Sequence, residues 1–463
     1  MTKRALALAA VPLLLGTSGA VAEPLSRAEA VAQALKANPV IRRSNADYQA
    51  LQGKAREARA DALPEVTVNG SFLRFRDPSI LNSSNFDQFP PEFKDFLTPQ
   101  TQNLWDTNVA VRQTVFSFAL SKAIRAAGYA KDLGSEDLRR ARQDVSLNAI
   151  LAYNGYLVAV ERAKVAERVV GQKEKQLEIT RSRRAAGAAT ELEVLRFDVD
   201  LQNARTELLR LTGAADLARG GLNAVLMRPI DTPVEATDSL EYSTMTAELE
   251  GTIKNAEANR PELKAAGWNE KIYDELIGIA KSDALPRVDL NGAYGWNTRE
   301  AGNIADSDFR KWSVSVAVKV PVFDGWRTAG RVAQARANRA RVGVDRAAFE
   351  EQIHLEAKQA VDRLRVAGSV LETAEAALGQ AQKALDMTDA NYRLGAANTL
   401  DVLNAQAAFA QAAINRVEAL HAHANARAGL RYVMALDPLE GTPNIPVADA
   451  QGPTTSNETG PTR

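Results

Sequence analysis

The chain has 463 residues, enough for two or three domains of ordinary size. Lysine plus arginine and aspartate plus glutamate both total 57, so the net charge is zero and does not indicate a nucleic-acid partner. The lack of cysteine excludes disulfides and thiolate chemistry. The three histidines are His354, His421 and His423, and the last two do not share a helix face. We therefore expect no metal site and no cofactor.

Residues 1–22 have the pattern of a secretory signal peptide. A basic start at Lys3 and Arg4 precedes the apolar run Ala5–Leu15, which is too short to span a bilayer, and Ala20-Val21-Ala22 fits a cleavage site. We expect an exported protein whose mature chain begins at Glu23. No later segment is apolar enough for a membrane helix, so any entry into a membrane is expected to use strands.

Two copies of one unit, residues 23–230 and 231–440, make up most of the chain. The motif Asp61-Ala62-Leu63-Pro64 recurs 222 positions later, at Asp283-Ala284-Leu285-Pro286. Residues 187–195 align in the same way with residues 395–403, 208 positions later. A period this long indicates one duplicated architecture rather than a short solenoid repeat.

Each copy is predicted to contain a helix, two strands and two very long helices. The first helix is expected from about Ser26 to Ala62 in one copy and from Met245 to Ala284 in the other. Pro64 and Pro286 follow, and proline cannot continue a helix.

Four segments alternate between apolar and polar residues, as strands do. They cover about 65–76, 105–117, 287–298 and 311–323. Each is long enough to cross a bilayer at a tilt. Trp105, Trp296 and Trp312 lie near one end of the apolar faces, as a membrane aromatic girdle does. A soluble sandwich is the alternative. Four strands cannot close a barrel alone, so the pattern favours a membrane barrel shared between chains.

The helices after the strands are unusually long. No proline occurs from Leu120 to Ala186 or from Thr328 to Leu394. A helix of roughly 65 residues is about 100 Å long, which indicates a coiled coil or a helical tube. Gly187 and Gly395 interrupt these helices, and a returning helix follows each. The tail, residues 441–463, is rich in proline, threonine, glycine and asparagine and is predicted to be disordered.

The order of these motifs resembles the outer membrane efflux protein family, the TolC-like channels. The resemblance runs from about Leu25 to Leu436. Its motifs are Asn38-Pro39, the repeated Asp-Ala-Leu-Pro, Val322-Phe323-Asp324-Gly325, Tyr392-Arg393-Leu394-Gly395 and Leu400-Asp401-Val402-Leu403.

The resemblance implies a mixed α and β membrane protein in the outer membrane of a Gram-negative bacterium, with most of its mass in the periplasm. A homotrimer would form a β-barrel, with four strands per chain, continuous with a periplasmic α-helical barrel. Its function would be passive export of drugs and toxic compounds. Its partners would be outer-membrane lipid, a periplasmic adaptor protein and an inner-membrane RND, ABC or MFS pump.

The resemblance also implies where the periplasmic aperture lies. Its expected residues are Tyr392, Asp401 and Asn404, with Glu193 and Arg196 as counterparts in the first copy. Asn404 stands where a second acid is expected, and Ala397 stands where an arginine is expected. Three copies of Asp401 would form a ring of negative charge. The alternative for Asp401 is an ordinary solvated acid at the start of a helix.

Two further sets of residues are expected to lie at the ends of the molecule. The turns at Gly187, Ala188, Gly395 and Ala396 would form the tips that contact the adaptor. The longer strand connection, roughly 76–104, would be the main surface loop and would partly cover the mouth of the barrel through Phe86, Phe89, Phe93 and Phe96. The alternative is that these phenylalanines only pack the loop onto the barrel rim.

Two other functions are compatible with parts of the pattern. A type I protein-secretion channel would share the fold and differ in cargo. A periplasmic coiled-coil scaffold would explain the helices but not the alternating strands. The sequence contains no nucleophile–base pair and no glycine-rich phosphate loop, so we do not expect an enzyme.

Overall fold

The computed structural model describes residues 23–82, 90 and 99–436. The predicted signal peptide, the tail that the sequence predicts to be disordered, and the phenylalanines of the long connection lie outside these residues. The chain divides into two compact units. One contains the residues up to Arg43, Arg139–Arg260 and the residues from Glu351 onward, and the other contains Ser44–Leu138 and Pro261–Glu350. These units do not coincide with the two sequence copies, since each copy contributes to both.

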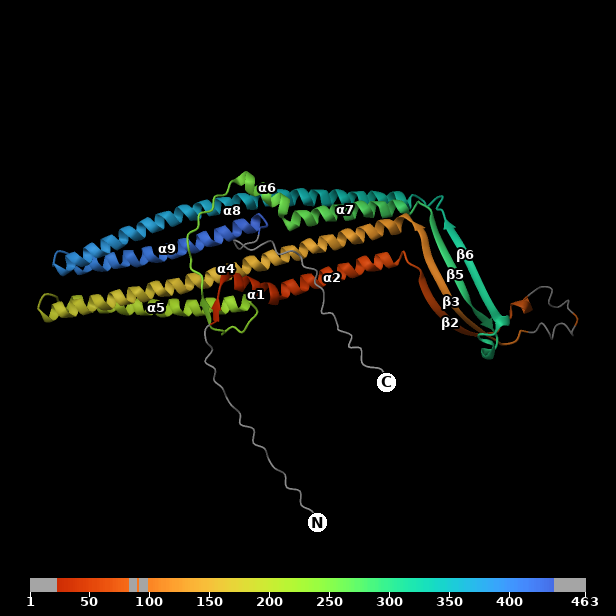
Figure 1. The fold of residues 1–463 in the computed structure, drawn as a ribbon, viewed down its shortest axis with the longest axis horizontal. Helices are drawn as coiled ribbons and strands as arrows, with labels where there is room; N and C mark the ends of the chain where they lie inside the picture. The colour runs from red at the N-terminus through yellow and green to blue at the C-terminus, as the bar shows by residue number, and fades with distance from the viewer. Residues whose placement is uncertain (1–22, 83–89, 91–98, 437–463) are drawn as a thin grey trace, which may run out of the picture. The chain divides into compact units, whose positions relative to one another are not determined.

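The unit that contains Ser44–Leu138 and Pro261–Glu350 holds a four-stranded antiparallel sheet of order β2-β3-β5-β6 (Figure 1). The strands are β2 (Glu65–Phe75), β3 (Gln102–Ser117), β5 (Arg287–Thr298) and β6 (Arg310–Lys319). β6 ends four residues before the predicted limit of 323, because Pro321 has no backbone N–H to donate to a ladder. Short 3-10 helices at Ala301–Asn303 and Ser307–Phe309 connect β5 to β6, and another follows β2 at Ser79–Asn82.

One face of the sheet is apolar and exposed. The strand register places Phe72 opposite Trp105 and Tyr294 opposite Trp312, so these rings share a face. More than a third of each large side chain on this face is exposed at the following positions: Val66, Val68, Phe72, Val109, Val111, Tyr294, Trp312, Val314, Val316 and Val318. An apolar surface of this extent marks an interaction site.

The opposite face of the sheet is polar and hydrogen-bonded across the strands. Asn69 donates to Asn108 (3.1 Å) and Asn297 donates to Asp106 (2.8 Å). The ammonium group of Lys311 pairs with the same Asp106 carboxylate. A sheet with one apolar and one polar face can separate lipid from water.

The prediction of one continuous helix before each strand pair was wrong. Each copy has two helices there: α1 (Arg27–Ala37) and α2 (Pro39–Ala60), then α6 (Leu249–Asn259) and α7 (Pro261–Ser282). The residue between them is extended in both copies, with ψ 128° at Asn38 and at Arg260. Pro39 and Pro261 cause the break, since proline disfavours the helical conformation in the residue before it.

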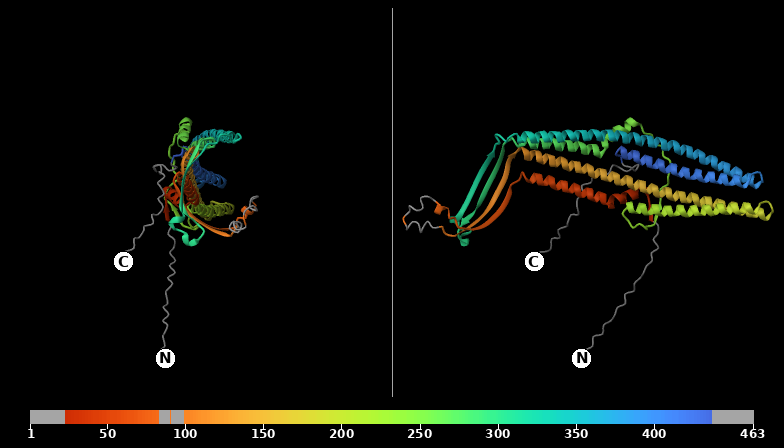
Figure 2. Two further views of the ribbon diagram at one scale, coloured as in Figure 1. Left: turned by 90° about the vertical axis from the view of Figure 1, so that its right-hand side faces the viewer. Right: turned by 180° about the vertical axis from the view of Figure 1, so that it is seen from behind.

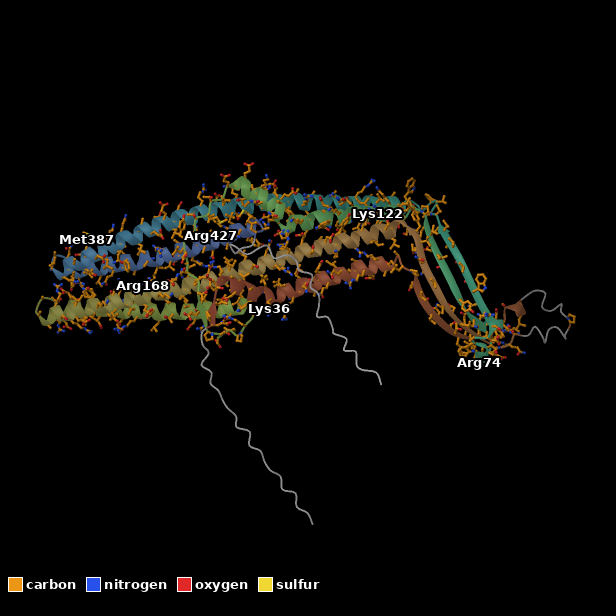
Figure 3. The ribbon with its side chains drawn as sticks, in the orientation of Figure 1. Lys36, Arg74, Lys122, Arg168, Met387 and Arg427 are labelled. Carbon is orange, nitrogen blue, oxygen red and sulfur yellow. The ribbon has the colours of Figure 1, made fainter. Side chains whose placement is uncertain are left out.

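The long helices are α4 (Phe118–Ala185, 68 residues), α5 (Glu191–Val225), α8 (Arg327–Arg393, 67 residues) and α9 (Thr399–Val433). Three views show α4 beside α5 and α8 beside α9 (Figures 1 and 2). Charged side chains project along their lengths (Figure 3). Among the described helices, none combines the length and hydropathy needed to cross a membrane.

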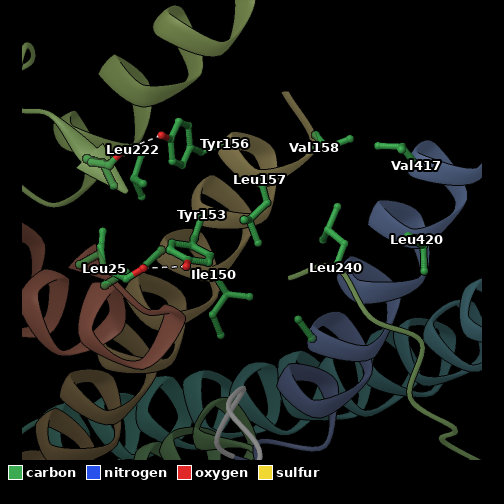
Figure 4. Close-up of a cluster of buried hydrophobic side chains, with 14 of the residues drawn as sticks. Leu25, Ile150, Tyr153, Tyr156, Leu157, Val158, Leu222, Leu240, Val417 and Leu420 are labelled. Atoms are coloured by element: carbon green, nitrogen blue, oxygen red, sulfur yellow. Dashed lines mark hydrogen bonds between the residues drawn. The ribbon is translucent and has the colours of Figure 1, made fainter. Parts of the chain in front are cut away.

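The other unit is held together by a core around Tyr153 of α4 (Figure 4). The short strands β1 (Glu23–Leu25) and β4 (Val234–Ala236) pair in parallel beside this core. The Tyr153 hydroxyl donates to the Leu25 carbonyl and the Tyr156 hydroxyl to the Val234 carbonyl, both at 2.7 Å. Burial raises the pKa of the Tyr153 hydroxyl to about 12. Sequence analysis did not predict β1 and β4, because three residues are too few to show an alternating pattern.

A matched pair of glycines in β5 tests the sheet. A Cβ at Gly295 would lie 2.0 Å from the Thr107 carbonyl oxygen, whereas a Cβ at Gly292 would meet nothing closer than 4.0 Å. Gly295→Ala should therefore force β3 and β5 apart and destabilise the protein by about 1–3 kcal/mol. Gly292→Ala should have little effect. Thermal unfolding followed by circular dichroism would show the difference, and equal midpoints would contradict the close approach of β3 and β5.

Candidate functional site

The turns that end α4 and α8 have the same backbone geometry. Gly187 and Gly395 have φ of 76° and 78°, values that favour glycine. The N–H of Ala188 donates to the Arg183 carbonyl, and the N–H of Ala396 donates to the Asn391 carbonyl. This is the helix-ending pattern in which a left-handed residue reverses the chain. The predicted tip residues are all exposed and lie in these two turns.

Tyr392, at the end of α8, joins the two pairs of long helices. Its side chain is 3% exposed. Its ring lies edge-on to Phe197 of α5, with the centroids 6.0 Å apart, and its hydroxyl is 3.5 Å from the Thr180 hydroxyl of α4. The contact with Thr180 and Phe197 brings α8 of the second copy against α4 and α5 of the first.

Arg183 of α4 completes the same contact, and sequence analysis did not identify it. Its guanidinium lies 4.4 Å from the centre of the Tyr392 ring and donates to the Tyr392 carbonyl at 2.6 Å. It also donates to the Ala188 carbonyl in its own turn. The arginine expected at position 397 is absent, and a cation from the neighbouring helix pair holds Tyr392. No local motif marks Arg183, since 209 positions separate it from its partner.

Asp401 and Asn404 lie exposed, one turn apart on α9. The Asp401 carboxylate accepts from the Asn398 N–H, and the Asn398 side chain accepts from the Asp401 N–H, both at 3.0 Å. This reciprocal cap starts α9. In the first copy, Thr190 caps α5 by accepting from the Glu193 N–H (3.3 Å).

The predicted aperture residues thus form separate groups within one chain. Tyr392 is buried, whereas Asp401 and Asn404 are exposed on α9 and Arg196 is exposed on α5. Within the described residues, no hydrogen bond or ion pair joins Asp401 to Glu193 or Arg196.

A titratable group that sequence analysis missed lies one turn before Tyr392. Asp389 is half-buried, and one of its carboxylate oxygens has no hydrogen-bond partner among the described residues. Burial raises the pKa of the Asp389 carboxyl above its usual value, and Arg393 opposes this effect while Asp386 adds to it. Met387, also on this turn of α8, is 67% exposed (Figure 3).

The apolar face of the sheet has aromatic residues at both ends, and sequence analysis identified only one group. Trp105, Trp296 and Trp312 lie at the end farther from the long helices in the strand register. The second group, at the strand–helix junctions, is Phe116, Phe118, Phe323 and Trp326.

The local backbone conformation directs the side chains of this second aromatic group away from the protein interior. An irregularity in the register between Thr114 and Phe116 returns Phe116 to the face of Val288. Phe323 and Trp326 are 79% and 77% exposed, and Trp326 has φ of 66°. Phe323 was visible in the sequence next to the strand, but the sequence analysis counted it as a strand residue and not as part of an aromatic group at a membrane interface.

Among the described residues, no cluster of three or more acidic or histidine side chains could hold a metal ion.

Comparison with known proteins identifies the family. The model of the outer membrane efflux protein family matches residues 30–226 and 252–435. Outer membrane protein OprJ of Pseudomonas aeruginosa is 26% identical over 392 residues, which cover 81% of this chain and 77% of OprJ. TolC of Escherichia coli is 24% identical over 422 residues, which cover 85% of this chain and 80% of TolC.

Solved structures share the fold. VceC of Vibrio cholerae superimposes with a TM-score of 0.75 at 19% identity, over 89% of this chain and 97% of VceC. CmeC of Campylobacter jejuni gives a TM-score of 0.76 at 14% identity, over 90% of this chain and 87% of CmeC. Because the family model matches well over half of its residues, this chain belongs to the outer membrane efflux protein family.

Proposed function

We propose that three copies of this chain form a passive exit channel for small toxic molecules. This proposal is more specific than the function in outer-membrane efflux that the family indicates. Each copy would give four strands to one barrel, and its long helices to a periplasmic tube. The observation that carries this proposal is the four-stranded sheet, which has an apolar face and, among the described strands, no partner on either edge. The proposed repeats are residues 23–230 and 231–440.

The sheet edges require partners. β2 and β6 each pair with one neighbour among the described strands, so their outer N–H and C=O groups have no ladder. In hydrocarbon, each unsatisfied backbone group costs several kcal/mol, and only helices and closed barrels avoid this cost. Two copies could close a barrel of eight strands and three copies one of twelve. The resemblance to trimeric channels favours three.

The two faces of the sheet support the proposed orientation. The valine-rich face would meet lipid, and the face with Asp106, Asn108 and Asn297 would line the water-filled lumen. The two aromatic groups would lie at the two membrane interfaces, where aromatic side chains gather. An exposed apolar face of this size has no role in a soluble coiled-coil scaffold, which argues against that alternative.

The cargo and the partners follow from the relatives. TtgF of Pseudomonas putida, 21% identical, is named as the outer membrane protein of a toluene efflux pump. We propose a similar small-molecule cargo, an inner-membrane pump, and a periplasmic adaptor that contacts the tips at Gly187, Ala188, Gly395 and Ala396. A protein-secretion channel would use the same barrel and tube, so the cargo is decided by transport assays with purified pump and adaptor.

Subunit contacts in the barrel can be tested with cysteines, since the chain has none of its own. Thr67→Cys in β2 with Ser315→Cys in β6 should form disulfides between chains, because these edge strands would be neighbours. Denaturing gels should show species of up to three chains, each of about 50.0 kDa before processing. Ala110→Cys in the inner strand β3 with Ser315→Cys should not crosslink. A crosslinked species that stops at two chains would contradict the trimer.

Arg183 is proposed to hold the aperture closed by tying α8 to α4. Arg183→Met should release Tyr392 and raise the resting conductance of single channels in planar bilayers, because a charge-assisted hydrogen bond and a cation–π contact are lost. Arg184→Met is the matched control, since Arg184 pairs with Glu191 beside the same turn. Equal resting conductance in the two variants would remove Arg183 from the closing contact.

Asp401 is proposed to set ion selectivity. Three copies of its carboxylate would concentrate cations at the narrowest point, so Asp401→Asn should lower the cation preference measured from reversal potentials. The asparagine keeps the shape needed to cap α9. Glu193→Gln should change selectivity less. If both variants keep the wild-type reversal potential, Asp401 acts only as a helix cap.

A further inference from the structure

A row of hydrogen bonds crosses one compact unit from α9 to α1. The Asn425 amide donates to His421 Nε2 at 3.0 Å, and its carbonyl oxygen accepts from the Asn154 amide at 2.8 Å. The carbonyl oxygen of the Asn154 side chain accepts from Arg27 Nε at 3.2 Å. The backbone N–H of Arg27 donates to Asp238 at 2.5 Å. The row therefore joins α9 of the second copy to α4 and α1 of the first.

The direction of every bond in the row follows from Arg27. A guanidinium has donors only, so Asn154 must present its oxygen to Arg27 and its amide N–H to Asn425. Asn425 must then present its own oxygen to Asn154 and its amide N–H to His421. His421 can accept only if Nε2 carries no proton. The arrangement therefore requires a neutral His421 with its proton on Nδ1.

The centre of the row is buried, so its polar groups cannot exchange these hydrogen bonds for hydrogen bonds to water. Asn154 is 1% exposed. The Arg27 guanidinium lies 5.7 Å from the centre of the Tyr153 ring, and the Tyr153 hydroxyl accepts from the Asp238 N–H at 3.4 Å. Arg27 and Asn154 are thus fixed by the same core that holds β1 and β4. A buried amide left without its partner costs more than the net value of one hydrogen bond.

Protonation of His421 would break the row at some point along its length. A protonated Nε2 is a donor and meets the N–H of Asn425 as another donor. If Asn425 turns its amide over, its N–H meets the N–H of Asn154. If Asn154 turns as well, its N–H meets Arg27 Nε. Arg27 cannot accept, so no set of amide orientations satisfies the row with His421 charged.

The charges around His421 do not compensate for its protonation. Arg162 of α4 and Glu418 of α9 face it, and they form an ion pair with each other at 2.8 Å. Burial lowers the pKa of His421 below its usual 6.5, Arg162 lowers it further, and Glu418 opposes both effects. A lowered pKa means that the neutral form stabilises the fold above about pH 6.5. This stability is lost as the pH falls further.

We propose that His421 makes this row a pH-sensitive tether, which holds α9 to α4 and α1 at neutral pH and releases it in acid. An effect on channel opening rests on the proposed function, but the tether itself does not. The chain has three histidines, so few groups titrate between pH 5 and 7. His423 lies two residues away on α9 and burial lowers its pKa as well, so a control variant must separate its effect from that of His421.

Amide hydrogen exchange of the full-length protein in detergent, at pH 7.5 and pH 5 and corrected for the intrinsic rate, tests the tether. In the wild type, amides of residues 415–428 should exchange on the order of tenfold faster in acid, as expected for loss of one or two hydrogen bonds. His421→Gln places a neutral acceptor near the position of Nε2 and should remove the pH dependence. His421→Lys, a permanent donor, should exchange fast at both pH values.

His354→Gln and His423→Gln are the controls and should keep the wild-type response. A pH response that survives in His421→Gln, or that disappears in His354→Gln or in His423→Gln, would overturn the tether. Single-channel conductance at pH 7.5 tests the proposed channel separately. A protein that does not conduct but shows this exchange pattern would contradict the proposed channel function and support the tether.

Discussion

The backbone N–H and C=O groups on the two outer edges of the sheet must form hydrogen bonds, and this requirement is the strongest constraint on how the protein can assemble. A strand edge in water is satisfied by solvent, but in hydrocarbon it must pair with another strand. Among the described strands, the sheet of β2, β3, β5 and β6 has an unpaired edge on each side. Because the apolar face of the sheet excludes water, one chain alone could not satisfy the edge N–H and C=O groups in hydrocarbon. In the proposed channel, assembly of several chains would therefore be a condition of membrane insertion.

Duplication supplies two similar helix pairs, and the polar contacts make them different. Both turns use a left-handed glycine, at Gly187 and Gly395, but of the two returning helices α9 begins with a reciprocal cap between Asn398 and Asp401, whereas α5 has only the Thr190 cap. The link between the copies is unequal as well, since Arg183 reaches across to Tyr392. If the proposed aperture opens and closes, contacts such as that of Arg183 with Tyr392 would define its closed state and would have to break on opening.

The regular parts of the fold were accessible from the sequence because their signals are local. Alternation along β5 and β6 and the absence of proline in α4 and α8 are visible in short windows. The breaks before Pro39 and Pro261 are also visible in the sequence, but only Pro39 entered the sequence analysis, and only as part of a motif. The link from Arg183 to Tyr392 could not be predicted, since it depends on how two helix pairs pack. The second aromatic group was missed because Phe323 was counted as the last residue of its strand, although it lies beyond the end of β6 at Lys319.

The pairing of β1 with β4 has a consequence for the order of folding. α1 has 11 residues, too few to be stable alone in water, and its buried Ala30, Val31 and Ala34 need neighbours. Those neighbours come late, because Arg27 binds Asp238, 211 positions further on. If the chain is exported from its N-terminus, as the sequence predicts, the first segment to arrive cannot complete its structure until about half of the protein has followed. Contacts this distant in sequence slow folding. The leading end would stay available to periplasmic chaperones for most of that time.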